Sequence, residues 1–138
     1  MWFVRRDPEE YLKKASLELF KAKIELYAAI RLVEKENKEK FFMEITVGTA
    51  LASGGTFILT PDVMVKIYVN GARKRVKKAI RLIEKYLRST RSGNPLLIED
   101  VRSILLECMD LGFREMYEKV SQALSMLQTI SQPLRFLQ

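Results

Sequence analysis

The chain of 138 residues has the size of one domain, and its 48% apolar and 30% charged residues are typical of a folded protein. It contains no histidine and one cysteine, Cys108, which excludes a disulfide within the chain, zinc sites of cysteine and histidine, and a catalytic histidine. The net charge of +7 is uneven, because residues 66–91 hold ten basic side chains and one acidic one. We therefore expect a nearly neutral body with one basic element that attracts a polyanion.

Residues 1–7 are predicted to form an arm ahead of the first helix. Trp2 and Phe3 would pack on the end of the bundle as a hydrophobic staple, which we favour, or dock on a neighbouring subunit as an assembly contact. Together with Arg5 and Arg6 they are also candidates for nucleic-acid contact. The apolar run is too short for a signal peptide, so we expect a cytoplasmic protein, which can also belong to a virion or nucleoprotein particle. Abundant Lys and Glu beside few Asn and Gln favour a thermophilic source.

A long first helix is predicted to start at Pro8, after Asp7 as its cap, and to run to about Lys40. One apolar stripe follows three- and four-residue spacing: Leu12, Ala15, Leu19, Ala22, Leu26, Ala29 and Val33. A second row widens the apolar face of this helix: Phe20, Ile24 and Tyr27.

Residues 45–61 carry no charge and leave several interpretations open. They indicate a small-residue helix ending at Ser53 and a buried connector after it, a β-hairpin about the glycine pair, a short membrane span, or a loop that becomes ordered in an assembly. We predict an irregular or hairpin-like Gly-rich connector at 45–60. Within it, Phe57 and Ile58 are candidate assembly contacts.

The second helix is predicted to start at Thr60-Pro61-Asp62 and to stop near Ser89. Asn70-Gly71 weakens it by about 1 kcal/mol relative to alanine, which predicts a kink or a firm start at Ala72.

A third long element opens at Asn94-Pro95 and is one helix bent at Gly112 or two helices that meet there. Its apolar stripe begins with Leu97, Val101 and Ile104. Pro133 ends it, and residues 133–138 form a tail. The sequence predicts a single all-α domain, 1–138, built as an antiparallel bundle of three long elements with four to five helices.

The functional signal is a basic face on the second predicted helix. At about 100° per residue, its cations share an arc of about 100°: Lys74, Lys77, Lys78, Arg81, Lys85 and Arg88. Arg73 and Arg75 lie at the flanks, and the apolar residues face the other way. Solvated helix faces usually mix both signs of charge, whereas this arc crowds cations together at a cost in repulsion. The pattern favours a polyanion-binding face over a merely solvated one.

Nucleic acid is the favoured polyanion, ahead of anionic lipid. Arg and Lys contact phosphates, whereas base reading also needs amide or aromatic side chains, in which the arc is poor. We expect a non-enzymatic protein without cofactor or metal that binds DNA or RNA independently of sequence. It would act as a scaffold, a packaging protein or a small subunit of a nucleoprotein assembly, as a homo-oligomer or in a larger complex. The alternatives are an adaptor or coat subunit that uses residues 45–61, and a membrane-associated protein.

Overall fold

The computed structural model describes residues 8–52, 60–89 and 95–131, with side chains described for 8–34, 60–89 and 96–130. Every element in these ranges is a helix, which confirms the all-α prediction. The helices are α1 (Pro8–Ala52), α2 (Pro61–Ser89), α3 (Pro95–Cys108) and α4 (Phe113–Ser131).

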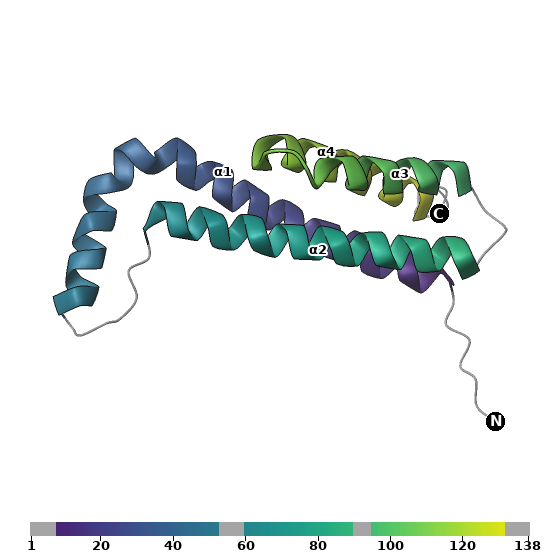
Figure 1. Ribbon diagram of the computed structural model, residues 1–138, viewed down its shortest axis with the longest axis horizontal. Coiled ribbons are helices and arrows are strands. Elements are labelled where there is room, and N and C mark those ends of the chain that lie inside the picture. The colour runs from purple at the N-terminus through teal and green to yellow at the C-terminus, as the bar shows by residue number, and fades with distance from the viewer. Residues whose placement is uncertain (1–7, 53–59, 90–94, 132–138) are drawn as a thin grey trace, which may run out of the picture.

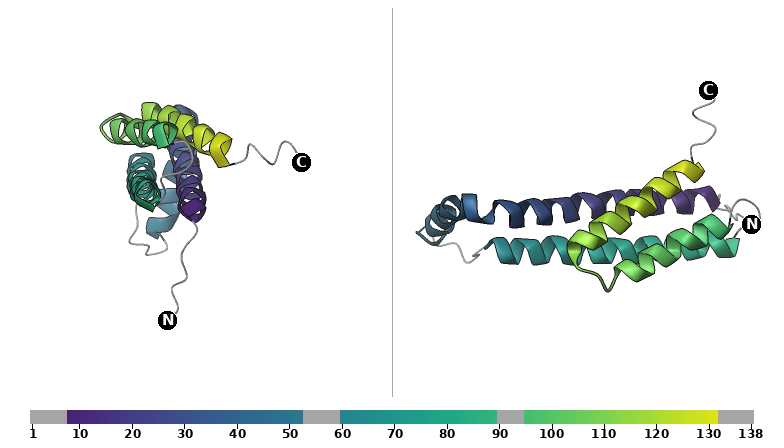
Figure 2. Two further views of the ribbon diagram at one scale, coloured as in Figure 1. Left: turned by 90° about the vertical axis from the view of Figure 1, so that its right-hand side faces the viewer. Right: turned by 90° about the horizontal axis from the view of Figure 1, so that it is seen from above.

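The helices form two layers. In Figure 1, α1 and α2 lie side by side and run in opposite directions, and α3 and α4 fold back on each other above them. In the views of Figure 2, α3 follows α2 while α4 crosses α1. Each helix of the second layer therefore rests on one helix of the first.

One hydrophobic cluster holds the two layers together, and all the helices contribute to it. On α1 the contributing residues alternate between leucine and alanine and are fully buried: Leu12, Ala15, Leu19, Ala22 and Leu26. The matching residues of α2 are Ala72, Val76, Ala79 and Ile83, and those of α4 are Met116, Val120, Leu124 and Leu127. The alanines let helix axes approach closely, and the leucines fill the space between them. We call the α1 residues the core stripe.

The second apolar row of α1 is not buried. Phe20, Ile24 and Tyr27 are each about half exposed, as is Leu17. Among the described helices, α1 packs against α2 and α4, and both lie on the side of the core stripe. No described helix packs on the opposite side, so the second row stays exposed.

The first helix continues beyond the predicted end near Lys40 and reaches Ala52. Adding a residue to an existing helix costs little, and a single glycine at position 48 costs about 1 kcal/mol, less than a break in the hydrogen-bond ladder. Residues 45–52 thus follow the alternative of a small-residue helix ending at Ser53, and the irregular or hairpin-like connector is wrong for them. Residues 53–59 lie outside the described part of the chain. Figure 1 shows the last part of α1 turned at an angle to its first part. Among the described residues, none of the helices combines the length and apolar character that a membrane span requires.

The second helix begins where its capping residues predict. Thr60 Oγ1 accepts a hydrogen bond from the N–H of Val63 at 3.2 Å, and its carbonyl accepts one from Met64 at 3.0 Å. The helix runs through Asn70-Gly71 without a break, so the predicted alternative of a firm start at Ala72 is wrong.

The third predicted element is two helices that meet near Gly112. After Cys108 the chain turns, and the N–H of Leu111 bonds the Cys108 carbonyl at 3.1 Å. The next helix starts with a bond of 2.9 Å from the N–H of Met116 to the Gly112 carbonyl. Since α3 packs against both α2 and α4, its buried face is rotated from the prediction: Ile98, Val101, Leu105 and Cys108 are buried, while Leu97 and Ile104 are half-buried.

Two leucines on one helix test the orientation of α1. We expect Leu19→Ala to lower the free energy of unfolding by about 2–5 kcal/mol, because it opens a cavity in the core. Leu17→Ala removes the same atoms from an exposed site and should change it by less than about 0.5 kcal/mol. Urea unfolding measures both. Equal losses would contradict the described packing.

Candidate nucleic-acid interface

The predicted arc of cations lies on the open face of α2. Its members are all exposed: Lys74, Lys77, Lys78, Arg81, Lys85 and Arg88. All but Arg88 line a shallow hollow of about 410 Å³, together with Leu82. We call these six cations the basic arc.

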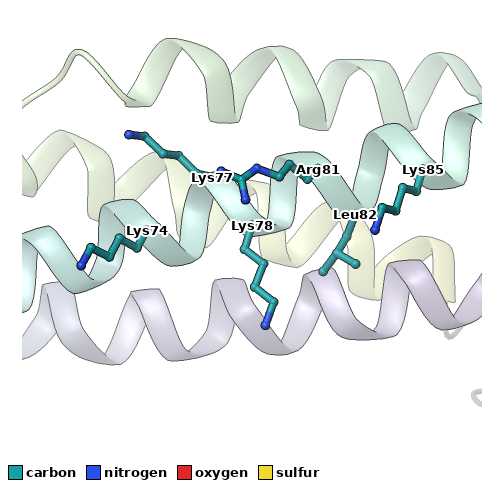
Figure 3. A pocket seen from close by; sticks show the side chains of 6 residues that line it. All are labelled: Lys74, Lys77, Lys78, Arg81, Leu82 and Lys85. Atoms are coloured by element: carbon teal, nitrogen blue, oxygen red, sulfur yellow. The ribbon is translucent and has the colours of Figure 1, made fainter.

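Figure 3 shows how the side chains of the hollow lie on α2. Lys74 and Lys78 extend toward the ribbon of α1, while Lys77 extends away from it and Arg81 lies between. Leu82 is largely buried and supplies an apolar patch among the cations. The charged groups thus spread over the width of the helix face instead of converging on one point. Such a surface fits an extended anion better than a small one.

Among the described residues, carboxylates pair with only one cation of the basic arc, Lys78. Glu84 is the one acidic residue in 66–91, and its Oε2 lies 3.4 Å from Nη2 of Arg102 on α3. Within the part of the chain that the structure describes, no ion pair forms at Lys74, Lys77, Arg81, Lys85 or Arg88. Solvent ions or a bound anion would therefore have to reduce the repulsion among these cations.

Arg75 ties the basic helix to α1. Its Nε donates a hydrogen bond to Glu25 Oε1, and its Nη1 donates one to Glu18 Oε2 at 3.2 Å. The hydrogen bond with Glu25 is the main cause that raises the pKa of Arg75, and burial opposes it. Glu18 Oε1 also lies 3.4 Å from Nζ of Lys78. The Glu25 carboxylate lies over Gly71, so a side chain at this position would require the end of the flexible Glu25 side chain to shift.

The predicted site residues thus divide into two groups. Lys78 is exposed and forms an ion pair with Glu18, which also binds Arg75. Arg75 is bound by both Glu18 and Glu25, and the sequence had not indicated these two carboxylates as its partners. Glu18 and Glu25 lie seven residues apart on one face of α1, and this spacing is the sequence feature that could have indicated them. Arg73 is half-buried, with its Nη1 3.5 Å from the Met109 carbonyl. The remaining candidates lie outside the described residues: Arg5, Arg6, Trp2, Phe3, Phe57 and Ile58.

Among the residues that the structure describes, no aromatic side chain lines the hollow of the basic arc. Tyr86 is on α2 but buried, and burial raises its pKa, with a further contribution from the charge of Glu9. The exposed aromatic residues Phe20 and Tyr27 belong to the side of α1 that faces away from the core. The arc therefore presents charge without a stacking partner for bases.

Cys108 lies in a place that disfavours the reactive thiolate. It is fully buried, its Sγ lies 3.1 Å from the Leu105 carbonyl, and burial raises the pKa of the thiol to about 11. The positive charges of Arg73 and Lys119 oppose this shift. Among the described residues, no group of three metal-binding side chains gathers at one place. Cys108 is therefore a free, buried thiol that belongs to the hydrophobic core.

Replacing Arg75 should destabilise the fold more than replacing an exposed arginine. Arg75→Gln leaves Glu18 nearly buried with Lys78 as its remaining ion pair, so we expect a loss of about 1–3 kcal/mol in the free energy of unfolding. Arg88→Gln is the matched control and should cost less than about 0.5 kcal/mol. Urea unfolding compares the two variants, and equal stabilities would show that Arg75 is not structural.

Cys108 should make stability fall at alkaline pH. Its folded pKa of about 11 lies above the value of about 8.5 for an exposed thiol, so its contribution is intact below about pH 8.5 and is lost as the pH rises to about 11. The stability difference between the natural protein and Cys108→Ala should therefore shrink by about 2 kcal/mol from pH 8 to pH 10. Urea unfolding at both pH values measures it. A constant difference would contradict the raised pKa.

Comparison with known proteins gives no functional lead. The chain matches no protein-family model, no curated protein and no solved structure. The function therefore has to be argued from the basic arc and its surroundings.

Proposed function

We propose that the protein binds the sugar–phosphate backbone of nucleic acid through the basic arc and works, without catalysis, in a nucleoprotein assembly. The observation that carries this proposal is the row of exposed cations that no carboxylate pairs in the described part of the chain: Lys74, Lys77, Arg81, Lys85 and Arg88. Uncompensated like charges cost stability, and bound phosphates would remove that cost.

The dimensions of the arc suit a nucleic-acid strand. From Lys74 to Arg88 the helix rises about 21 Å, which matches about six base-pair steps of a duplex. The cations occupy a shallow hollow and spread over the helix face, so they would contact successive phosphates. A small anion would meet two or three of them at most.

Binding is proposed to be independent of sequence. Lys and Arg on the arc are accompanied by Leu82 and by no amide or aromatic side chain that lines the hollow. Phosphate contacts set position and affinity, whereas base contacts set specificity. The protein would therefore serve as a scaffold, packaging protein or small subunit, in several copies or within a larger complex.

Salt dependence tests the proposal. We expect the chain to bind a short single strand and a duplex at low salt, with affinity that falls steeply as salt rises. Lys77→Glu with Arg81→Glu should weaken binding about tenfold or more and reduce the log–log salt slope by about two units, since two phosphate contacts are lost. Fluorescence anisotropy across a salt series gives both quantities.

The matched control reverses two exposed cations on the outer side of α1, Lys13→Glu with Arg31→Glu. This variant has the same net charge as the first, so an equal loss of affinity would show that overall charge matters and the arc does not. Absence of binding at low salt would reject the proposal. The alternative of an adaptor that uses residues 45–61 would then be favoured. Its apolar association is expected to persist in high salt, which distinguishes it from phosphate binding.

A further inference from the structure

A row of large apolar side chains on α1 takes no part in the core or the basic arc. Leu17, Phe20, Ile24 and Tyr27 are each between 49% and 53% exposed. We call these four residues the outer stripe. Single exposed apolar residues are ordinary on protein surfaces, but a contiguous row of this size is typical of a contact surface.

The spacing of the outer stripe is that of a helix–helix seam. The four residues follow each other at three, four and three positions, as the a and d positions of a heptad repeat do. From Leu17 to Tyr27 the helix rises about 15 Å, so the row is nearly straight along about three turns. A second helix laid along it would bury all four side chains.

None of the other described helices covers this side of α1. At 100° per residue, the outer stripe lies opposite the core stripe, which faces α2 and α4. One edge is in contact with the rest of the protein: the Tyr27 ring lies 6.2 Å from that of Tyr117 on α4, and Lys23 Nζ lies 6.0 Å from the Tyr117 ring. These contacts hold Tyr27 and Lys23 in place before any partner arrives.

Cations outnumber carboxylates beside the outer stripe, although the exposed Glu10 and Glu34 lie beyond its two ends. Between positions 13 and 31 the cations are Lys13, Lys14, Lys21, Lys23 and Arg31. The carboxylates in the same interval are Glu18 and Glu25, and both pair with Arg75 of α2. The apolar row is therefore framed by cations, which a partner with carboxylates would complement.

From the spacing, exposure and charge frame of this row, we infer that the outer stripe of α1 is the docking site for an acidic amphipathic helix of a partner protein. Such a helix places apolar side chains over Leu17, Phe20, Ile24 and Tyr27 and carboxylates beside the lysines. This site is separate from the basic arc on α2, so the inference does not rest on nucleic-acid binding.

A second copy of the chain fits the outer stripe less well. Its own stripe would bring the same cations and, between positions 13 and 31, no unpaired carboxylate to meet them. A nucleic acid would gain nothing from Leu17 and Ile24, which present no ring for stacking. The regular three-and-four spacing also matches a rigid helix better than a lipid surface, for which no seam is needed.

The test uses the whole chain and two synthetic helical peptides of three heptads. Both peptides carry leucine at a and d, and they differ at e and g, where one has glutamate and its twin has lysine. We expect the acidic peptide to bind at least tenfold more tightly than the basic twin, as measured by isothermal titration calorimetry. Equal affinities, or no binding of the acidic peptide, would overturn the inference.

Two variants of the chain assign the binding to the outer stripe. Phe20→Gln with Ile24→Gln removes apolar area but keeps good helix formers at exposed sites, and should weaken the acidic peptide at least tenfold. Lys14→Glu with Lys21→Glu should weaken the acidic peptide and strengthen the basic twin. Circular dichroism checks that both variants remain folded. Unchanged affinity in both would place the peptide elsewhere.

The variant of the basic arc, Lys77→Glu with Arg81→Glu, keeps the outer stripe and should bind the acidic peptide with less than threefold change. Light scattering and vesicles of phosphatidylserine with phosphatidylcholine test the other occupants. A dimer, or vesicle binding, that Phe20→Gln with Ile24→Gln abolishes while the acidic peptide does not bind would overturn the inference in favour of a second copy or a lipid surface.

Discussion

The leucines and alanines of the core stripe on α1 join the two layers of the fold. They lie on the face with which α1 packs against α2 in its own layer and against α4 in the other layer. This arrangement determines which sides of the helices remain open. With Leu12, Leu19 and Leu26 turned inward, the opposite side of α1 faces solvent, and α2 is oriented with its alanines toward α1 and its cations outward. Both candidate surfaces are therefore consequences of one packing face.

The ion pairs between α1 and α2 add a second constraint. Arg75, with Glu18 and Glu25, sets the position of one helix along the other, and Gly71 makes room for the Glu25 carboxylate. These pairs use the acidic residues of α1 that lie closest to the basic arc. Of the basic arc only Lys78 shares one of these carboxylates, so the other five cations keep their positive charge without an ion pair among the described residues.

The two open surfaces differ in the forces that they offer. The basic arc attracts anions through charge and would lose its partner as salt rises, whereas the outer stripe offers apolar area within a cationic frame and would keep much of its affinity. A protein with both surfaces could link a nucleic-acid backbone to an acidic protein partner. The two proposals stand on different residues, and each can fail without the other.

The sequence by itself determined the helical class, the cap that begins α2, and the clustering of six cations on one helix face, because these features depend on neighbours within a few residues. The structure confirmed the first of these and placed the cations in solvent. Tertiary structure alone decided which of the two apolar rows of α1 is buried, since Leu19 and Phe20 both follow helical spacing. It also decided that Arg75 is structural while Arg81 is exposed, because that choice depends on where Glu18 and Glu25 of another helix lie. Local patterns predict helices and faces, whereas the partner of each face is set by contacts between residues far apart in the chain.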